Sequence, residues 1–369
     1  MRRALELAQE AEGFTAPNPM VGAVVVSPDG RIVGEGYHHA PGLPHAEVEA
    51  LNQAGDQSVG ATLYVNLEPC CHFGRTPPCS KKIIEHKLSR VVVGIADPNP
   101  KVAGGGLKEL SEAGIDLTVG VLESECGYLN RGFFKAIKEN LPWLSLKMAL
   151  TLDGRIADRT AASRYVTGAT ARKFVMALRA AYDAVLIGAN TARLDDPQLD
   201  VRLGEGAENV QRNPVRAVLD PNCTVKSDAR IFAAQGKTII FCREELLVKQ
   251  SDYPSSCSLV SLSESPEGTG RLDIGAALQY LLEQGCQKVL CEGGGQLAGS
   301  LIDAGLVDEL YWFVAPKMLV DKEALPVVAS ANPRLIADSV EWQITGANFL
   351  GDDLLISALN PRHSGYTQI

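Results

Sequence analysis

Hydrophobic and polar positions alternate along the first 140 residues with two different periods. Leu5, Ala8 and Ala11 recur at helical spacing, which predicts an amphipathic helix at the start of the chain. The run over residues 21–26 is apolar throughout, and a Ser-Pro-Asp-Gly turn separates it from a hairpin partner over residues 31–37. Further strands are predicted over residues 62–66, 91–95 and 115–121, and helices over residues 2–12, 46–54, 80–86, 107–113 and 125–139. This order of elements is typical of a three-layer α/β domain.

A domain boundary is predicted where this first pattern ends. Asn140-Leu-Pro142 stops the preceding helix, because proline disfavours a helical conformation in the residue before it, and a new apolar run begins at Trp143. Predicted strands cover residues 144–149, 184–188, 215–219, 238–242, 288–291, 309–314, 342–348 and 353–358, predicted helices cover 170–180, 274–284 and 296–304, and polar surface loops cover 203–213 and 250–270. We therefore expect two α/β domains, over residues 1–141 and 142–369.

Composition and charge exclude several classes of function. With 46% apolar and 21% charged residues, this is an ordinary globular chain, and 369 residues favour two or three domains. The net charge of −9 argues against sequence-independent binding to nucleic acid, which depends on Lys and Arg. We also expect no membrane span, since no run approaches about 18 uncharged apolar residues.

Cysteine usage indicates a reducing compartment. The chain has nine cysteines, an odd number, and three of them lie in one short segment. Five others fall in or beside apolar runs and are interpreted as reduced core residues: Cys223, Cys242, Cys257, Cys286 and Cys291. The charged amphipathic start lacks the apolar core of a signal peptide, so we expect the cytoplasm.

Two short segments carry the groups of a zinc site. His45-Ala-Glu47, followed by Pro-Cys70 and a further thiol at Cys79, is the pattern of zinc-dependent nucleobase deaminases. Zn²⁺ takes imidazole nitrogen and thiolate sulfur, and a catalytic site leaves one position for water, whose pKa falls from about 15.7 to roughly 7. We assign His45, Cys70 and Cys79 as ligands and Glu47 as the group that carries protons from the water to the ring and the leaving amine.

The alternatives are buried cysteines without metal, or a structural zinc site whose fourth ligand would be Cys71 or His72. A closed site would give Glu47 no task, which favours the catalytic interpretation. Other polar residues near the motif are ambiguous. Asn18 lies between two prolines, as turn residues often do, and His38 and His39 could line a pocket, although loop histidines are commonly solvated.

The spacing of the two thiols is unusual for a zinc deaminase. Eight residues separate Cys70 from Cys79, where most zinc deaminases have two. The segment Pro-Cys-x-His-x-Gly-Arg-Thr-Pro-Pro-Cys nevertheless resembles the deaminase half of bacterial bifunctional riboflavin-biosynthesis enzymes. These join a diaminohydroxyphosphoribosylaminopyrimidine deaminase to a 5-amino-6-(5-phosphoribosylamino)uracil reductase, so the resemblance implies a reductase domain after the first boundary.

The second half carries matching segments. Gly293-Gly-Gly295, between a predicted strand and helix, is suited to binding a phosphate at a helix N-terminus, although a simple tight turn is as good an interpretation. The acidic residue expected about 20 positions later in a Rossmann unit has no convincing counterpart, so we predict no Rossmann domain. Taken with the segments that begin at Lys147 and Gly188, the glycine turn resembles the reductase half of the same family. The resemblance implies a cytidine-deaminase-like domain followed by a dihydrofolate-reductase-like domain that uses NADPH.

The resemblance also implies site residues. The expected NADPH-binding residues are Ala149, Tyr165, Thr191, Asp195, Gly294, Gly295, Gln296, Leu297, Ala298, Gly299 and Ser300. The expected substrate-binding residues are Ser163, Arg179, Leu199, Arg202 and Glu292, with Asn18 in the deaminase half. Two guanidiniums suit a ribose 5-phosphate, and Asp195 or Glu292 could deliver the proton that accompanies hydride transfer, with Asp195 as the expected catalytic residue.

The expected function is therefore bifunctional. Zinc-dependent deamination of 2,5-diamino-6-(5-phospho-ribosylamino)pyrimidin-4(3H)-one would precede NADPH-dependent reduction of the ribosyl group of the product to ribityl. The expected partners are the small-molecule substrate and further copies of the chain in a homo-oligomer. The alternatives are a nucleoside or tRNA deaminase with an accessory domain, and a non-catalytic regulator that binds zinc and a nucleotide.

Overall fold

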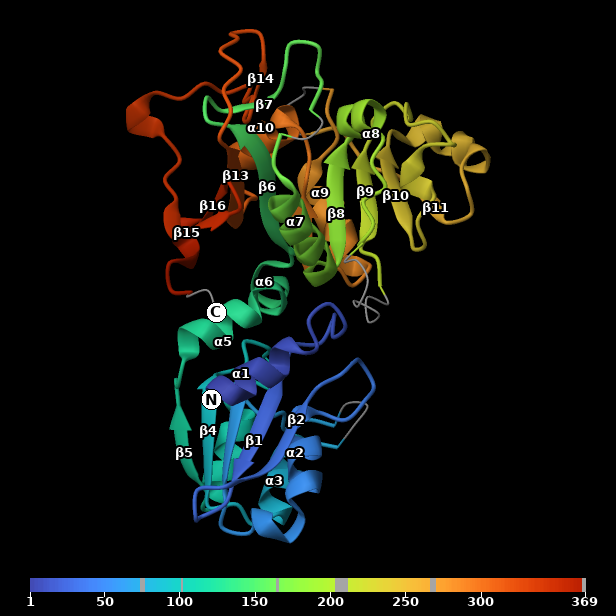
Figure 1. Ribbon diagram of the computed structural model, residues 1–369. Helices are drawn as coiled ribbons and strands as arrows, with labels where there is room; N and C mark the ends of the chain where they lie inside the picture. Colours follow the sequence, from blue (N-terminus) through green and yellow to red (C-terminus); the bar gives the residue numbers. More distant parts are fainter. Residues whose placement is uncertain (74–76, 101, 164–165, 203–211, 266–269, 367–369) are drawn as a thin grey trace. The chain divides into compact units, whose positions relative to one another are not determined.

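The computed structural model describes all residues of the chain except 74–76, 101, 164–165, 203–211, 266–269 and 367–369. The described residues form two compact units (Figure 1). Residues 1–140 make up the first unit together with Gly365 and Tyr366, and residues 141–364 make up the second.

The first unit is built on a mixed sheet with strand order β2-β1-β3-β4-β5. Strand β1, which lies between β2 and β3, is antiparallel to both, whereas β3, β4 and β5 run parallel. The strands are β1 (Gly22–Val26), β2 (Ile32–Tyr37), β3 (Thr62–Leu67), β4 (Arg90–Ile95) and β5 (Asp116–Val119). The helices are α1 (Arg2–Gln9), α2 (Ala46–Ala54), α3 (Cys79–Glu85), α4 (Gly105–Glu112), α5 (Glu123–Leu129) and α6 (Arg131–Glu139), with a 3-10 turn at Gly55–Ser58.

Helices cover both faces of this sheet. Buried side chains of α2, α3 and α4 pack against one face, and α1 and α5 contribute to separate apolar clusters elsewhere in the unit (Figure 1). The helix predicted over residues 125–139 is interrupted at Asn130, which separates α5 from α6. The Asn130 side chain accepts from Met20 N at 2.8 Å and donates to Met20 O at 2.9 Å. This buried amide binds the backbone of a residue 110 positions away, so the local hydrophobic periodicity does not indicate that the helix is interrupted at Asn130.

The second unit contains a larger mixed sheet. Its described strands follow the order β11-β10-β9-β8-β12-β6-β13-β16-β15, parallel from β11 to β13 and antiparallel beyond. The strands are β6 (Trp143–Thr151), β8 (Ala184–Gly188), β9 (Val215–Leu219), β10 (Thr238–Cys242), β11 (Cys257–Ser261), β12 (Lys288–Cys291), β13 (Glu309–Ala315), β15 (Gln343–Leu350) and β16 (Asp353–Leu359), and β7 (Arg155–Ala157) pairs separately with β14 (Leu325–Pro326). The helices are α7 (Ala169–Ala181), α8 (Ala189–Asp195), α9 (Ile274–Glu283) and α10 (Gly295–Asp303), with 3-10 segments at Arg230–Phe232, Glu244–Asp252, Ile336–Asp338 and Pro361–His363.

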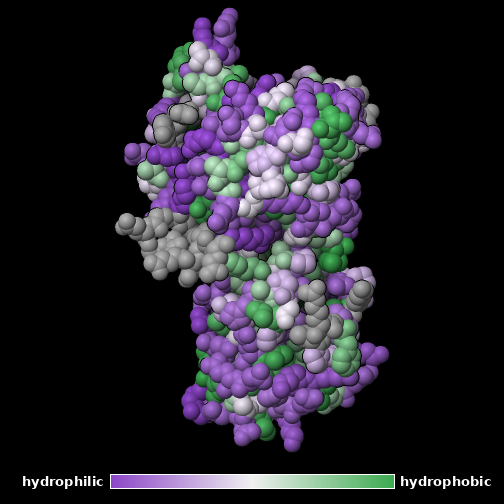
Figure 2. Space-filling model, turned by 90° about the vertical axis from the view of Figure 1, so that its right-hand side faces the viewer, coloured by the Kyte–Doolittle hydropathy of each residue, from purple (hydrophilic) through white to green (hydrophobic). Residues whose placement is uncertain are grey.

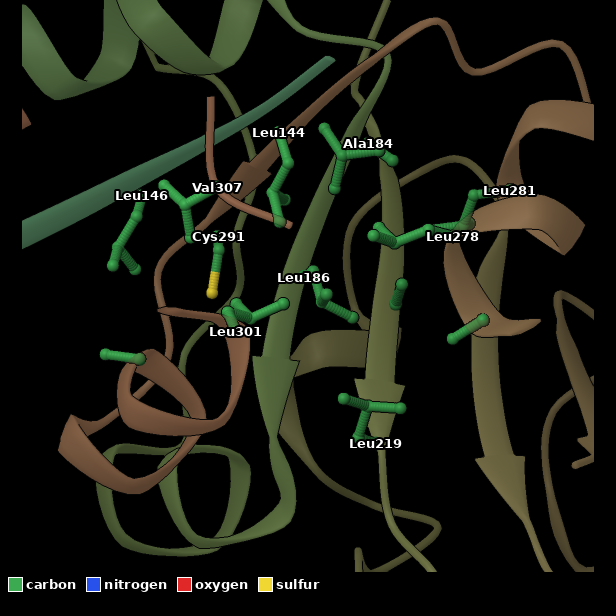
Figure 3. Close-up of a cluster of buried hydrophobic side chains, with 14 of the residues drawn as sticks. Leu144, Leu146, Ala184, Leu186, Leu219, Leu278, Leu281, Cys291, Leu301 and Val307 are labelled. Atoms are coloured by element: carbon green, nitrogen blue, oxygen red, sulfur yellow. The ribbon is translucent and has the colours of Figure 1, made fainter. Parts of the chain in front are cut away.

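Two apolar cores hold the layers of the second unit together. Helices α9 and α10 pack on one face of the sheet, and α7 and α8 pack on the other. Figure 3 shows part of the first core, where side chains of four strands meet those of the two helices. Its labelled members are Leu144, Leu146, Ala184, Leu186, Leu219, Leu278, Leu281, Cys291, Leu301 and Val307. Each fully buried leucine stabilises the fold by about 1.5–3 kcal/mol relative to exposure, so this cluster fixes the strand ends that carry the site.

The prediction of a surface loop over residues 250–270 is wrong in part. Strand β11 lies within it and pairs in parallel with β10, with Cys257 opposite Thr238. The strand is only five residues long and is flanked by serines, so its alternating burial is a weak signal in the sequence. The five cysteines interpreted as reduced core residues are free and buried, as predicted.

Polar and apolar residues are mixed on the surface of the molecule (Figure 2). The face in Figure 2 is largely hydrophilic, with hydrophobic patches scattered among polar residues. Within the described parts of the chain, every helix is too short or too polar to cross a bilayer.

Candidate active sites

The first unit brings the predicted zinc ligands together at two helix N-termini. His45 is the N-cap residue of α2, Cys79 is the first residue of α3, and Cys70 lies in the segment after β3. The positive end of a helix dipole favours a thiolate, so the start of α3 suits Cys79 as a ligand. The backbone N–H of Cys79 also donates to Cys70 Sγ at 3.4 Å, which ties the two thiols to each other.

The three donor atoms form a compact cluster. His45 Nδ1 lies 3.2 Å from Cys79 Sγ and 3.6 Å from Cys70 Sγ, and all three atoms fall within 4.8 Å of one another. Hydrogen bonds from Cys79 and His45 lower the pKa of Cys70 to about 4, so this thiol is ionised at neutral pH. One imidazole and two thiols are a donor set that suits Zn²⁺.

The cluster has three members in the described part of the chain. Cys71 Sγ instead contacts Val102 O at 3.9 Å, and His72 lines the adjoining cavity. The closed structural site considered from the sequence would need one of these two residues as a fourth ligand. The described geometry therefore favours a site with an open position.

Glu47 lies in the first turn of α2 and is 3% exposed. Burial raises the pKa of its carboxyl, and the negative charge of Cys70 raises it further. It lines a cavity of about 450 Å³ together with His45 and Cys70. A buried carboxyl with a raised pKa beside a metal site suits a group that both takes up and releases a proton.

Asn18 and His38 line the same cavity and contact each other. His38 Nδ1 lies 3.0 Å from Pro44 O, and His38 Nε2 lies 3.0 Å from Asn18 Nδ2. Because a carbonyl oxygen only accepts, Nδ1 carries the proton, and the neutral ring accepts from the Asn18 amide through Nε2. The expectation that loop histidines are solvated fails for His38, which is 3% exposed, and holds for His39, which pairs with Glu49 on the surface.

A buried carboxylate fixes another wall of this cavity. Glu68 accepts hydrogen bonds from the backbone N–H groups of Asp97, Gly104 and Leu107, so it holds the loop between β4 and α4. Asp97 also lines the cavity, and burial raises its pKa to about 6. Neither carboxylate has a spacing that marks it as a site residue in the sequence.

The second unit has a cavity of about 580 Å³ where β8 and β12 lead into α8 and α10. Ligands commonly bind at such carboxyl ends of parallel strands. The predicted residues that line it are Ser163, Thr191, Asp195, Gly294, Gly295, Gln296, Leu297 and Ser300. Ser163 Oγ donates to Asp195 Oδ1 at 2.6 Å across this cavity wall.

The glycine turn before α10 has no room for a side chain at Gly295, whereas Gly294 is not crowded. Gly294 is the N-cap residue of this nine-residue helix. A Cβ on Gly295 would lie 2.4 Å from Pro326 O, and one on Gly294 would lie 3.6 Å from Thr191 Oγ1. The turn and the N-terminus of α10 line the cavity, which fits the pyrophosphate of a dinucleotide.

Arg179, Glu292 and Lys147 form a buried charge cluster beyond the lining of this cavity. Arg179 Nε and Nη2 donate to the two Glu292 oxygens at 2.6 and 3.0 Å, and Lys147 Nζ lies 3.8 Å from Glu292 Oε2. Burial alone would raise the pKa of Glu292, but the two cations outweigh it and lower the pKa. Lys147 begins one of the segments that carry the family resemblance but is not among the predicted site residues, and burial lowers its pKa.

Arg179 and Arg202 meet at Asp200. Arg179 Nη1 donates to Asp200 O at 3.1 Å, and Arg202 Nε lies 3.2 Å from Asp200 Oδ1. Arg202 is exposed, whereas Arg179 is buried. Two of the predicted phosphate-binding guanidiniums thus lie near one another, although neither lines the cavity.

The remaining predicted residues that the structure describes do not line the cavity. Leu199 is 3% exposed, has a φ of 54° and packs in the core. Ala149 on β6 packs against the same core, Ala298 is fully buried, and Gly299 lies against Ala329. Tyr165 lies outside the described residues.

Comparisons with known proteins cover both units. Residues 142–356 match the family model of the RibD C-terminal domain, and residues 1–95 match that of the cytidine and deoxycytidylate deaminase zinc-binding region. The riboflavin biosynthesis protein RibD of Escherichia coli (strain K12) is 40% identical over 364 residues, which cover 96% of this chain and 97% of that protein. RibD of Aquifex aeolicus (strain VF5) is 40% identical over 357 residues, or 96% of each chain.

A solved structure from Thermotoga maritima matches along the whole chain. It is described as a diaminohydroxyphosphoribosylaminopyrimidine deaminase/5-amino-6-(5-phosphoribosylamino)uracil reductase, and it is 36% identical with a TM-score of 0.86. The match covers 98% of this chain and 97% of that one. These findings confirm the predicted fold class, a cytidine-deaminase-like half followed by a dihydrofolate-reductase-like half.

Proposed function

The chain belongs to the RibD family of riboflavin biosynthesis proteins, and on that premise we propose that it catalyses two consecutive reactions. The first is hydrolytic deamination of 2,5-diamino-6-(5-phospho-ribosylamino)pyrimidin-4(3H)-one. The second is NADPH-dependent reduction of the ribosyl group of 5-amino-6-(5-phospho-ribosylamino)uracil to ribityl. The observation that carries the proposal is the cluster of His45, Cys70 and Cys79 on a cavity that also holds buried Glu47.

In the deaminase site, Glu47 moves the protons. Zinc held by His45, Cys70 and Cys79 supplies, when bound, a water acidic enough to attack the ring carbon that bears the amine. Glu47 takes a proton from the attacking water and gives it to the ring nitrogen. It then takes the remaining proton of the added hydroxyl and delivers it to the amine, which leaves as ammonia while the C=O bond forms. The raised pKa of this carboxyl supports both transfers.

Asn18 orients the pyrimidine in the same cavity. One N–H of its Nδ2 group donates to His38, and its Oδ1 atom has no hydrogen-bond partner among the described residues. The amide oxygen is therefore available to accept an N–H from the pyrimidine. This acceptor favours a substrate that presents an N–H edge to this wall.

In the reductase site, NADPH supplies, when bound, the hydride for the open-chain imine of the ribosyl group. Asp195, held by Ser163 on the cavity wall, delivers the proton to the imine nitrogen. Glu292 suits this task less, because Arg179 and Lys147 keep it ionised. We assign the ribose 5-phosphate to Arg179 and Arg202, which meet at Asp200, with Leu199 and Glu292 completing the substrate site.

Glu47→Gln in zinc-loaded protein tests the deaminase assignment. With the freshly prepared diaminopyrimidine ribosyl phosphate, we expect ammonia release to fall about 10²- to 10⁴-fold, with zinc content unchanged. Glu49→Gln is the matched control, because Glu49 lies on the same helix and pairs with His39 on the surface. An active Glu47→Gln variant would refute the proton-transfer role. NADPH oxidation after ammonia release tests the second reaction, and its absence would refute the reductase assignment.

We further propose that the protein acts in the cytoplasm as a homo-oligomer. Its buried free thiols fit a reducing compartment. Around the edge strand β15, apolar side chains are exposed at Leu335, Ile336, Ile344 and Phe349, by 67–95%. An edge strand with this many exposed apolar groups is a surface that association would cover.

A further inference from the structure

The cavity of the second unit carries two cationic side chains in its described lining, Arg193 and Arg271. Arg193 Nη2 donates to Asn190 Oδ1, and Arg271 Nη1 donates to Ser300 Oγ at 2.9 Å. Both partners are neutral, and neither arginine forms an ion pair with a described carboxylate. Two uncompensated positive charges therefore border a cavity of about 580 Å³.

The carboxylates of the same cavity do not cancel this charge by direct contact. Asp220 is 1% exposed and is turned into its own loop, where its oxygens accept from Thr224 N, Thr224 Oγ1 and Val225 N at 2.6, 2.9 and 2.8 Å. Asp195 accepts from Ser163 Oγ at 2.6 Å. Both acids are thus engaged by neutral donors, which leaves the guanidiniums available to an anionic ligand.

Arg271 contacts α10 at a distance from the N-terminus of the helix that matches the layout of a dinucleotide. The N-terminus of α10 at Gly295 suits a pyrophosphate, and Arg271 contacts the same helix at Ser300. Five residues of α-helix span about 7.5 Å, which is the length scale of one ribose with its substituents. The loop Asp220–Thr224, which contributes several lining residues, borders the same cavity. Arg271 therefore lies where the adenosine half of the coenzyme would extend from its pyrophosphate, and Arg193 on α8 borders the same cavity.

We propose that Arg193 and Arg271 bind the adenosine 2′-phosphate of NADPH and so set the preference for NADPH over NADH. This inference rests on the proposed reductase function. A guanidinium offers paired N–H donors that match phosphate oxygens, and charge-assisted bonds of this kind are the strong ones. NADH has a hydroxyl at this position, which leaves both cations without a counter-charge.

Calorimetric binding of adenosine 2′,5′-bisphosphate and of AMP to the full chain tests the proposal without any turnover. We expect the wild type to bind the bisphosphate more tightly than AMP. Arg193→Ala and Arg271→Ala should each weaken bisphosphate binding about tenfold or more, since each removes a charged hydrogen-bond donor, and the double variant should bind the two nucleotides alike. Arg271→Lys should retain part of the preference, because it keeps the charge and loses the paired donors.

Arg230→Ala is the matched control, because Arg230 is an exposed arginine of the same unit that donates to Gln198 and does not line the cavity. It should bind both nucleotides like the wild type. A double variant that keeps the full bisphosphate preference would overturn the proposal, as would a wild type that does not discriminate. A wild type that oxidises neither NADPH nor NADH with the deaminated substrate would instead refute the proposed function, so the two failures are distinguishable.

Discussion

Asn18 and His38 form a hydrogen-bonded pair whose direction is fixed by a third group, the carbonyl of Pro44. The carbonyl holds the proton on His38 Nδ1, so Nε2 accepts from Asn18 and the amide cannot turn over without losing that bond. The 3.0 Å contact therefore determines which end of the amide faces away from the histidine. His38 acts in the proposed deaminase through Asn18, as a positioning residue.

Replacement of His38 by alanine removes the hydrogen bond that orients the Asn18 amide. We expect His38→Ala to raise KM for the diaminopyrimidine ribosyl phosphate about fivefold to tenfold, the equivalent of one hydrogen bond, with a smaller change in kcat. Ammonia release measures both constants. His39→Ala is the control, because the neighbouring ring is 43% exposed and pairs with Glu49. Equal effects of the two substitutions would show that His38 does not position Asn18.

The two adjacent cysteines of the motif should differ in their effect on metal binding. Cys70→Ser removes one of three donors within 4.8 Å, so we expect zinc content to fall well below one ion per chain after dialysis, together with ammonia release. Cys71→Ser should keep its zinc, since that thiol contacts Val102 O instead. Atomic absorption on both proteins decides the point. Loss of zinc from the Cys71 variant would make Cys71 part of the metal site.

The zinc cluster is predictable from the sequence because its chemistry constrains short segments. His45 and Glu47 are two residues apart at one helix start, and Cys79 opens another, so the three residues are expected at the ends of neighbouring strands of one sheet. His38 and Glu68 give no such signal. Their roles depend on Pro44 O and on backbone N–H groups of a distant loop, which only the folded chain brings to them.

In the reductase half, even fewer of the structural features can be predicted from the sequence. Strand β11 escapes prediction because it is short and polar at its ends, and the pairing with β10 supplies the regularity that the sequence lacks. Arg179 and Glu292 lie 113 positions apart, and no local pattern indicates that they form a bidentate pair. The family resemblance implied both as substrate-binding residues, but their contact with each other depends on the fold.

That pair should matter for stability. Glu292 is 7% exposed at its side chain, so Arg179→Ala leaves a buried carboxylate with Lys147 as its remaining cation. We expect the free energy of unfolding to fall by about 3 kcal/mol, since the buried carboxylate loses its bidentate partner and keeps only the longer contact with Lys147. Urea unfolding followed by tryptophan fluorescence reports this unit, because Trp143, Trp312 and Trp342 all lie in it.

Arg202→Ala is the control for this measurement. Its guanidinium is 58% exposed in the pair with Asp200, so the loss should stay below about 1 kcal/mol. The triple variant Lys147→Met/Arg179→Met/Glu292→Leu should recover part of the stability lost in Arg179→Ala, because it removes all three charges of the buried cluster. Similar losses for Arg179→Ala and Arg202→Ala would contradict the idea that burial sets the cost.

Asp97 should make the stability of the first unit depend on pH. Burial raises its pKa from 3.8 to about 6, so between these values the folded state holds a proton that the unfolded state has released. Stability therefore falls as pH rises from about 4 to above 6, where the buried carboxyl must ionise.

Asp97→Asn removes this cost and keeps an oxygen that accepts from Asn99 N. Scanning calorimetry of the zinc-loaded protein should show the variant's midpoint matching the wild type near pH 4 and exceeding it at pH 8. Asp116→Asn, on an exposed side chain of β5, should show no such divergence, and a constant offset for Asp97→Asn would contradict the prediction.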